Sequence, residues 1–200
     1  MLDLATIRRD GEVEAIMEMS ERQIEALGFT EHSRRHAGIV SKWSGEILRA
    51  LGKDEDRVRL VEIAGYLHDI GNCINRKDHA QSGAILAYKI LTRLGMKPLE
   101  TAEIMMAIGN HDEQYGQPVS DISSALIIAD KADVHKSRVR NAVSDVFKAN
   151  IHDRVNLAAE KSFVRVEEGG SVIALHIDID TAICSVIHYF EIYFRRMQLS

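Results

Sequence analysis

The chain has 200 residues, a formal net charge of −5 at pH 7 and a hydrophobic content of 46%. This length suits one domain with a sizeable core, and the mildly acidic balance argues against a nucleic-acid polymer or an anionic membrane as partner. The two cysteines form no CxxC pair, so neither a disulfide framework nor a thiolate zinc site is expected. The chain shows no signal-peptide pattern and no apolar run long enough to span a bilayer, which predicts a cytoplasmic protein.

Apolar residues at helical spacing predict a series of helices over the first two thirds of the chain. The predicted helices run over residues 10–27, 30–51, 54–67, 79–94, 98–108 and 122–143. Thr30 is expected to cap the second helix, and Ser120 or Asp121 the sixth. Residues 71–78 and 109–120 are expected to form loops, because they are rich in Gly, Asn and Asp.

The pattern changes in the last quarter of the chain. Residues 162–180 alternate around Gly169–Gly170, which predicts a β-hairpin, and Asp180 is expected to cap a final helix. We therefore predict a mainly α fold, a helical bundle with a small C-terminal β-hairpin and a final helix. Residues 1–150 would form a helical metal-binding domain, and residues 151–200 an appendage that is not an independent domain.

The final helix carries more apolar residues than one buried face needs. Its main stripe comprises Ile183, Ile187, Phe190, Phe194 and Met197. Three more apolar residues lie off this stripe: Val186, Tyr189 and Tyr193. Because a one-sided surface helix needs only one apolar stripe, we predict that the second face is buried in a homodimer.

Histidine is the unusual entry in the composition, with nine copies. Six histidines and aspartates belong to different predicted helices or helix ends: His36, His68, Asp69, His79, His111 and Asp130. A helical bundle can gather such side chains around one point. Imidazole and carboxylate donors without a thiolate favour Fe, Mn, Ni, Co, Zn or Mg. Six donors exceed the need of one ion that also holds water, whereas two divalent ions that share one carboxylate would use them all.

This ordered set resembles the HD-domain metal-dependent phosphohydrolases, whose pattern is an early histidine, a His-Asp doublet, further histidines and a late aspartate. The phrases HAGIV, AGYLHDIG, HAQSGA and IIADKAD are similar to that superfamily, and the resemblance covers residues 30–140. It implies a right-angled helical fold with the site at its centre. It also implies hydrolysis of a phosphate ester or anhydride of a small molecule such as a nucleotide.

The resemblance implies a role for each member of the set. One ion would be held by His36, His68, Asp69 and Asp130, and a second by Asp69, His79 and His111. Asp69, His111 and Lys131 are expected to take part in catalysis. Two alternatives to hydrolysis stay open. Some members of the superfamily are di-iron oxygenases, and the chain could also be a non-catalytic metal-binding sensor or oligomerisation protein.

Several neighbouring residues are further candidates. His32 lies four residues before His36, and either could be the first ligand; we favour His36 and place His32 behind the ligands or facing the substrate. Asp112 and Glu113 follow His111. They could complete the second ion's surroundings, orient a ligand or transfer protons, and the alternative is a solvated polar loop.

Basic residues near the doublet and the late aspartate could bind a substrate phosphate. Lys131, His135 and Arg138 recur at i, i+4 and i+7, so on one helix they would share a face about a quarter-turn from Asp130. A solvated charged face is the commoner meaning of such a stripe. Arg76 and Lys77, in the predicted loop after the doublet, are candidates for the same role.

Overall fold

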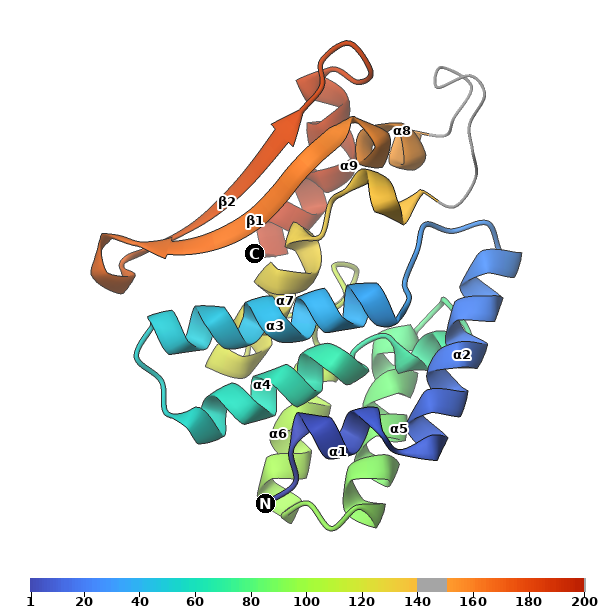
Figure 1. Cartoon of the computed structure of the whole chain (residues 1–200), viewed down its shortest axis with the longest axis vertical. Coiled ribbons are helices and arrows are strands. Elements are labelled where there is room, and N and C mark those ends of the chain that lie inside the picture. The colour runs from blue at the N-terminus through green and yellow to red at the C-terminus, as the bar shows by residue number, and fades with distance from the viewer. Residues whose placement is uncertain (140–150, 200) are drawn as a thin grey trace.

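A computed structural model of the chain describes residues 1–139 and 151–199 (Figure 1). The helical part contains α1 (Leu4–Arg8), α2 (Gly11–Ala26), α3 (Arg34–Ala50), α4 (Glu55–Leu67), the 3-10 helix η1 (Ile70–Cys73), α5 (His79–Arg93), α6 (Pro98–Gly109), α7 (Asp121–Ala132) and the 3-10 helix η2 (Lys136–Arg138). The appendage contains α8 (Ile151–Ala158), β1 (Ala159–Glu167), the 3-10 helix η4 (Glu168–Gly170), β2 (Val172–Ile179) and α9 (Val186–Leu199). The predicted fold class is confirmed.

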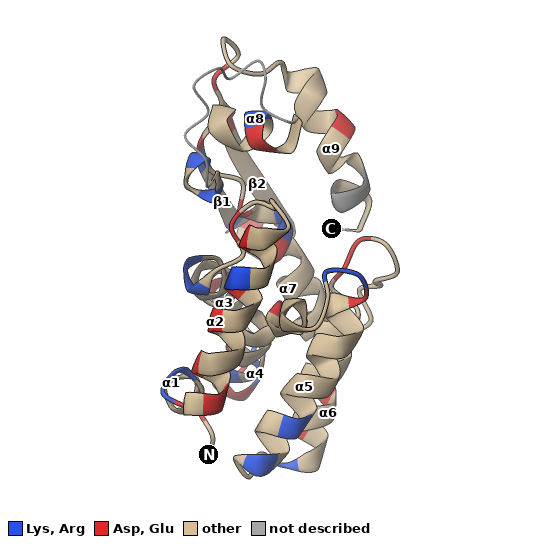
Figure 2. Ribbon diagram, turned by 90° about the vertical axis from the view of Figure 1, so that its right-hand side faces the viewer, with Lys and Arg blue, Asp and Glu red and all other residues tan. Residues whose placement is uncertain are grey.

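The helices of the first part enclose one main core. Helix α3 packs along α4, α5 packs on α6, and α7 contacts α3, α4 and α6. Fully buried side chains such as Leu48, Leu67, Ile104 and Leu126 come from four of these helices. Basic and acidic positions are mixed along the helices of both parts (Figure 2). Among the described residues, no helix combines the length and the apolar character needed to cross a membrane.

The structure contradicts one predicted N-cap and confirms another. Helix α3 begins at Arg34, and its N-cap is Ser33, whose hydroxyl accepts from the backbone nitrogen of Arg35, so the predicted cap at Thr30 is wrong. The chain before Ser33 is held away from the helix, since Glu31 N donates to Arg138 O at 2.8 Å. The predicted cap of α7 is Ser120, as its side chain accepts from the backbone nitrogen of Ser123.

Helix α7 is shorter than predicted. It ends at Ala132, and the predicted continuation is wrong for residues 133–139; residues 140–143 lie outside the described part of the chain. Arg138 Nη1 donates at 2.7 Å to the carbonyl oxygen of Asp133, which a continuing helix would use itself, and the tertiary contact of Arg138 with the Glu31 carbonyl oxygen holds it there. Lys131, His135 and Arg138 therefore do not share one helix face.

The predicted hairpin is confirmed. Strands β1 and β2 pair antiparallel, with Val164 opposite Leu175 and an irregularity near Ala159, and the connection places Gly169 and Gly170 at φ +66° and +99°. Figure 1 shows the hairpin beside α3, and β1 contacts both α3 and α7. The appendage is thus packed on the two helices that carry the early histidine and the late aspartate.

The appendage has a small apolar cluster of its own. Its buried members are Val134, Val155, Ala158, Ala159, Cys184, Tyr189 and Tyr193. Helix α8 supplies part of this cluster and was not expected from the sequence. Helix α9 begins at Val186, so the predicted cap at Asp180 is wrong; the Asp180 carboxylate instead accepts from Ala182 N in the turn after β2.

Helix α9 packs against the protein through residues of the face that was expected to be buried in a homodimer. Tyr189 and Tyr193 are buried, with stacked rings 4.7 Å apart between centroids. Ile187, Phe190 and Phe194, members of the predicted main stripe, are exposed. Val186, the third residue off the main stripe, is 45% exposed, so the buried face of α9 is formed by Tyr189 and Tyr193.

Candidate metal centre

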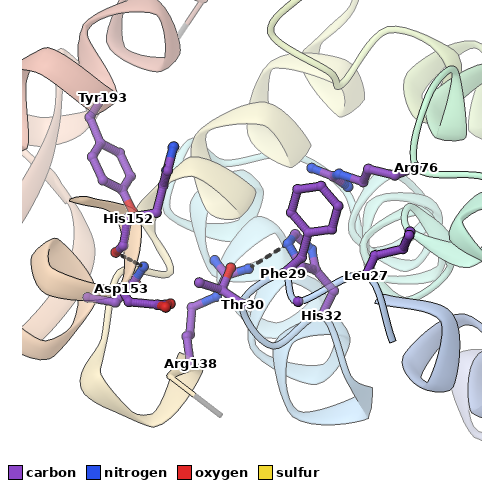
Figure 3. Close-up of a pocket in the computed structure, with 11 residues that line it drawn as sticks. Leu27, Phe29, Thr30, His32, Arg76, Arg138, His152, Asp153 and Tyr193 are labelled. Carbon is purple, nitrogen blue, oxygen red and sulfur yellow. Dashed lines mark hydrogen bonds between the residues drawn. The ribbon is translucent and has the colours of Figure 1, made fainter. Parts of the chain in front are cut away.

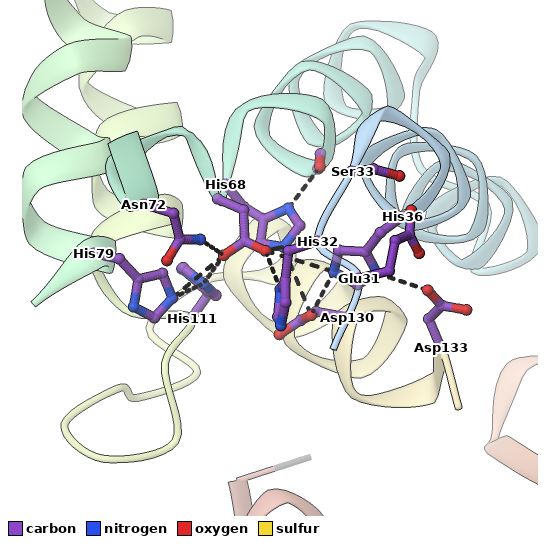
Figure 4. A network of polar contacts seen from close by, with 12 residues as sticks. Glu31, His32, Ser33, His36, His68, Asn72, His79, His111, Asp130 and Asp133 are labelled. Atoms are coloured by element: carbon purple, nitrogen blue, oxygen red, sulfur yellow. Dashed lines mark hydrogen bonds and ion pairs between the residues drawn. The ribbon is translucent and has the colours of Figure 1, made fainter. Parts of the chain in front are cut away.

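The six predicted ligands meet where α3, α4, α5 and α7 converge (Figure 4). His36 lies on α3, His68 caps the end of α4, Asp69 precedes η1, His79 is the first residue of α5, His111 follows α6 and Asp130 lies on α7. The four histidines are buried, and the side chains of Asp69 and Asp130 are 12% and 10% exposed. Residues separated by up to 94 positions are thereby gathered around one point.

Each imidazole ring is oriented by a contact at its Nδ1 atom, on the side away from the centre. The Nδ1 atoms of His68, His79 and His111 lie 2.8, 3.0 and 2.7 Å from the backbone carbonyl oxygen three residues earlier in the chain. His36 Nδ1 instead lies 2.7 Å from the carboxylate of Asp133. Carbonyl and carboxylate oxygens only accept, so each Nδ1 carries a hydrogen, and each Nε2 faces the centre as the atom that can bind a metal.

Asp69 stands between two pairs of histidines. Its Oδ2 lies 3.4 Å from His68 Nε2 and 3.8 Å from His36 Nε2. Its Oδ1 lies 3.4 Å from His79 Nε2 and 4.0 Å from His111 Nε2, and these two nitrogens are 3.2 Å apart. The two oxygens of one carboxylate thus face two different donor groups.

Asp130 completes the group around His36 and His68. Its Oδ1 lies 3.2 Å from His36 Nε2 and 3.6 Å from His68 Nε2. Both Nε2 atoms are buried and make no hydrogen bond of acceptable geometry with the described residues. Buried polar atoms without a hydrogen bond are unfavourable unless another group, such as a cation, contacts them. Ligand atoms at metal–ligand distances of about 2.0–2.2 Å are themselves roughly 3–3.6 Å apart, so the residues present fit a divalent metal ion.

Charges in the centre keep the carboxylates ionised. Burial would raise the pKa of Asp69 and of Asp130, but His68 beside Asp69 and Lys131 beside Asp130 outweigh it, and both pKa values lie well below the usual range. Burial would lower the pKa of His68, but Asp69 and Asp130 outweigh it and raise that pKa to about 10. Burial lowers the pKa of His111 well below its usual range, so this ring is neutral at physiological pH.

His32 contacts the centre through Asp69. Its Nδ1 lies 2.6 Å from Asp69 Oδ2, and its Nε2 lies 3.3 Å from Arg138 Nη2. Arginine can only donate, so His32 Nε2 accepts and Nδ1 donates to the carboxylate. The structure therefore places His32 where it orients Asp69, while His36 presents Nε2 to both Asp69 and Asp130.

The acidic residues after His111 lie at the rim of the centre. Asp112 Oδ2 is 3.8 Å from His79 Nε2. Glu113 Oε2 is 2.7 Å from Lys131 Nζ, which is in turn 2.6 Å from Asp130 Oδ2. Lys131 is thus held beside the centre by two carboxylates, and its expected part in catalysis stays a prediction.

The structure places the predicted phosphate-binding residues in different surroundings. Arg138 is buried, and its guanidinium donates to the backbone carbonyl oxygens of Glu31 and Asp133. Arg76 lies at the rim of the centre, 3.7 Å from Asp69 Oδ1, with its side chain 24% exposed. Lys77 is exposed.

His135 lies elsewhere. It lines a separate hollow with Arg35, Trp43 and Ser137, and its ring bonds to the Ser137 side chain. The helix face that was expected to bring His135 to the substrate does not exist, because α7 ends before it.

Two positioning residues were not expected from the sequence. The Asp133 carboxylate accepts a hydrogen bond from His36 Nδ1 and another from Arg35 Nη2 at 3.0 Å. Asn72 Nδ2 donates to Asp69 Oδ1 at 2.9 Å. The sequence held a signal for both, since Asp133 lies three residues after Asp130 and Asn72 three residues after Asp69, but only the folded chain shows the contacts.

Two proteins are similar to the chain in sequence. The chain is 28% identical over 135 residues to the uncharacterized protein MJ1020 of Methanocaldococcus jannaschii, covering 57% of this chain and 52% of the relative. It is 26% identical over 159 residues to a ribonuclease Y of Lawsonia intracellularis, covering 76% of this chain and 28% of the relative. The chain thus spans about half, or less, of the length of these relatives.

A solved structure titled as a predicted HD superfamily hydrolase, from an uncultured Thermotogales bacterium, matches with a TM-score of 0.49 and 25% identity, covering 67% of this chain and 75% of that chain. The family model of the HD domain matches residues 29–137, which include all six predicted ligands. The chain therefore belongs to the HD domain family.

Proposed function

We propose that the chain is a metal-dependent hydrolase that cleaves a phosphate ester or anhydride at a centre of two divalent ions. The observation that carries this proposal is the position of Asp69, whose two oxygens face two separate histidine pairs. A carboxylate shared in this way is suited to bridge two ions. The name of one relative, ribonuclease Y, also supports chemistry at a phosphate ester.

The residues would divide the work as follows. His36, His68 and Asp130 would hold one ion, His79 and His111 the other, and Asp69 both. When bound, such ions lower the pKa of a water and neutralise charge on a phosphate. The fixed Nδ1 contacts keep every Nε2 atom directed at the centre, so no ring has to reorient.

Lys131 and Arg76 lie where a phosphate in the centre would meet them. Both line the narrow hollow over the centre, together with Asp69, His79 and His111 among others. Their side chains can donate to non-bridging phosphate oxygens and offset the charge that develops on them. Glu113, bonded to Lys131, and Asp112, beside His79, are carboxylates placed to accept or return a proton at the leaving group.

The first test is metal content together with turnover. We expect about two Fe, Mn, Ni, Co, Zn or Mg ions per chain, and phosphate release from small phosphate esters such as nucleotides. His68→Ala and Asp69→Ala should lose metal and turnover, whereas His176→Ala, at an exposed hairpin position, should keep both. Full metal content and turnover in either centre variant would refute the site. Iron together with an absolute need for oxygen would instead indicate an oxygenase.

A further inference from the structure

A cavity of about 300 Å³ lies beside the metal centre, between the loop after α2 and the appendage (Figure 3). One wall comes from Leu27, Phe29 and Thr30 in that loop. The opposite wall comes from His152, Asp153 and Asn156 on α8 and Tyr193 on α9. The cavity therefore exists only because the appendage faces the helical part of the chain.

The cavity and the hollow over the metal centre share a wall. His32, Arg76 and Arg138 line both of them. His32 is bonded to Asp69, and Arg76 lies 3.7 Å from the same carboxylate. A phosphate at the centre and a group in the cavity would therefore both lie against Arg76.

The wall nearest the centre is suited to a planar ring. Phe29 is 45% exposed, and the guanidinium carbon of Arg76 lies 6.0 Å from the centroid of its ring. Figure 3 shows the Phe29 ring and Arg76 together at one side of the cavity. A flat heteroaromatic ring can stack on an exposed phenyl ring, and the adjacent guanidinium favours an electron-rich partner.

The opposite wall is polar. Asp153 and Tyr193 face the cavity from the appendage, with Tyr193 held by its stack on Tyr189 (Figure 3). A carboxylate offers several acceptor positions, so Asp153 can accept a hydrogen bond from a ligand group that donates, such as an amino group, a ring N–H or a hydroxyl.

We infer that this cavity binds the organic part of the substrate, and that it selects phosphate esters whose alcohol carries a planar ring with hydrogen-bond donors. The inference rests on the proposed hydrolase function. The volume lies at the lower end of the range for small-molecule sites, which suits one ring-bearing unit. The wall formed by α8 and α9 lies outside the match to the HD family model, whereas Phe29 and Arg76 lie inside it, so the proposed selectivity combines both parts of the chain.

The experiment uses calorimetry to compare the binding of two ligands to the metal-loaded protein: adenosine 5′-monophosphate, and ribose 5-phosphate, which carries a hydroxyl in place of the adenine. The wild-type chain should prefer the ring-bearing ligand by tenfold or more. Phe29→Ala should reduce that preference by about tenfold, the usual effect of removing one stacking side chain, and Asp153→Asn should also reduce it. Neither variant should change the affinity for ribose 5-phosphate or the metal content.

Two variants serve as controls. Tyr88→Ala removes an aromatic ring of equal exposure, 46%, on α5, and Asp178→Asn neutralises an exposed carboxylate on β2. Both should keep the wild-type preference. Equal binding of the two ligands by the wild-type chain, or an unchanged preference in Phe29→Ala and Asp153→Asn, would overturn the inference. The readout is binding, so a preference that depends on Phe29 and Asp153 supports the proposed role of the cavity even when no phosphate is released. Phosphate release without that preference would support the hydrolase function and refute the role of the cavity.

Discussion

His36 Nδ1 donates to Asp133 Oδ2 at 2.7 Å, whereas the other three predicted histidine ligands use backbone carbonyl oxygens for the same purpose. A carboxylate behind an imidazole fixes the ring and makes its Nε2 a stronger donor to a metal. Asp133→Ala should therefore weaken metal binding about 10–100-fold, the usual effect of losing such a partner. Competition with a chelator of known affinity would measure this.

Asp133→Asn provides the graded control. The amide oxygen can still accept from His36 Nδ1, so this variant should lie between the wild-type chain and Asp133→Ala. Equal metal affinity in all three proteins would show that the contact does not support the ligand.

Metal binding should release protons. In the metal-free chain, Asp69 and Asp130 outweigh the effect of burial and raise the pKa of His68 to about 10, so its ring is protonated at pH 8. A metal needs the Nε2 lone pair, and binding at pH 8 should therefore release about one proton from His68. Metal affinity should rise with pH until about 10 and then level off.

Calorimetry in two buffers of different ionisation enthalpy would count these protons. His111 should contribute none, because burial holds its pKa well below neutral. The raised pKa of His68 also affects the stability of the metal-free chain. Its contribution to the stability of the metal-free chain is fully present below pH 6.5, the unfolded value, and is lost as the pH rises through about 10. A binding heat that is identical in both buffers would contradict the prediction.

Gly71 sets the distance between Asp69 and His79. A Cβ at Gly71 would overlap the carbonyl oxygen of His79 and lie 2.5 Å from Gly83 N, so η1 and α5 would have to move apart. Gly71→Ala should destabilise the fold by about 1–3 kcal/mol and weaken metal binding at the Asp69–His79 pair. Thermal unfolding and metal titration would show both effects.

Gly11→Ala is the matched control, since a Cβ at Gly11, the first residue of α2, meets no atom within 4 Å. This variant should keep the wild-type stability and metal affinity. A Gly71→Ala protein as stable as Gly11→Ala would refute the close packing of η1 on α5.

The exposed face of α9 leads to a prediction about assembly. Ile187, Phe190 and Phe194 are 70%, 45% and 57% exposed on this face, and exposed apolar side chains on one helix can form a contact with another protein chain. We predict a homodimer in which a second copy covers the face. Light scattering should give twice the chain mass at micromolar concentration, and Phe190→Glu should reduce it to one chain. A wild-type monomer under these conditions would refute the prediction.

The sequence predicted the helices and the hairpin whose formation depends on local interactions. The helices that became α2, α4, α5 and α6 follow from apolar spacing and end signals, and the hairpin follows from alternation around Gly169–Gly170. The six ligand positions came from their order in the chain and the family resemblance. They converge because four helices meet at one point, which no local pattern encodes.

The errors have tertiary causes. The end of α7 depends on Arg138, which binds the Asp133 carbonyl oxygen from six positions beyond the helix. Helix α8 has only eight residues, too few for a clear period. The buried face of α9 could not be chosen from the sequence, because both faces are apolar and only the fold shows that Tyr189 and Tyr193 turn inward.

Arg76 and Arg138 were predicted to share a role, and the structure separates them. Arg138 is buried against the backbone carbonyl oxygens of Glu31 and Asp133, so Arg138→Ala should lower stability and disturb His32 rather than act on a substrate. Arg76 lies partly exposed between the centre and the cavity.

Arg76→Ala should therefore raise KM for a phosphate ester about tenfold or more while thermal stability and metal content stay unchanged, because one charge-assisted contact to the phosphate is lost. The neighbouring Lys77→Ala, which removes an exposed cation next in sequence, should leave KM unchanged. Steady-state kinetics of both variants, with metal content measured on the same samples, separates substrate binding from damage to the centre. If Arg76→Ala loses metal, Arg76 acts by holding Asp69 in place, and the phosphate at the centre is bound by Lys131 without it.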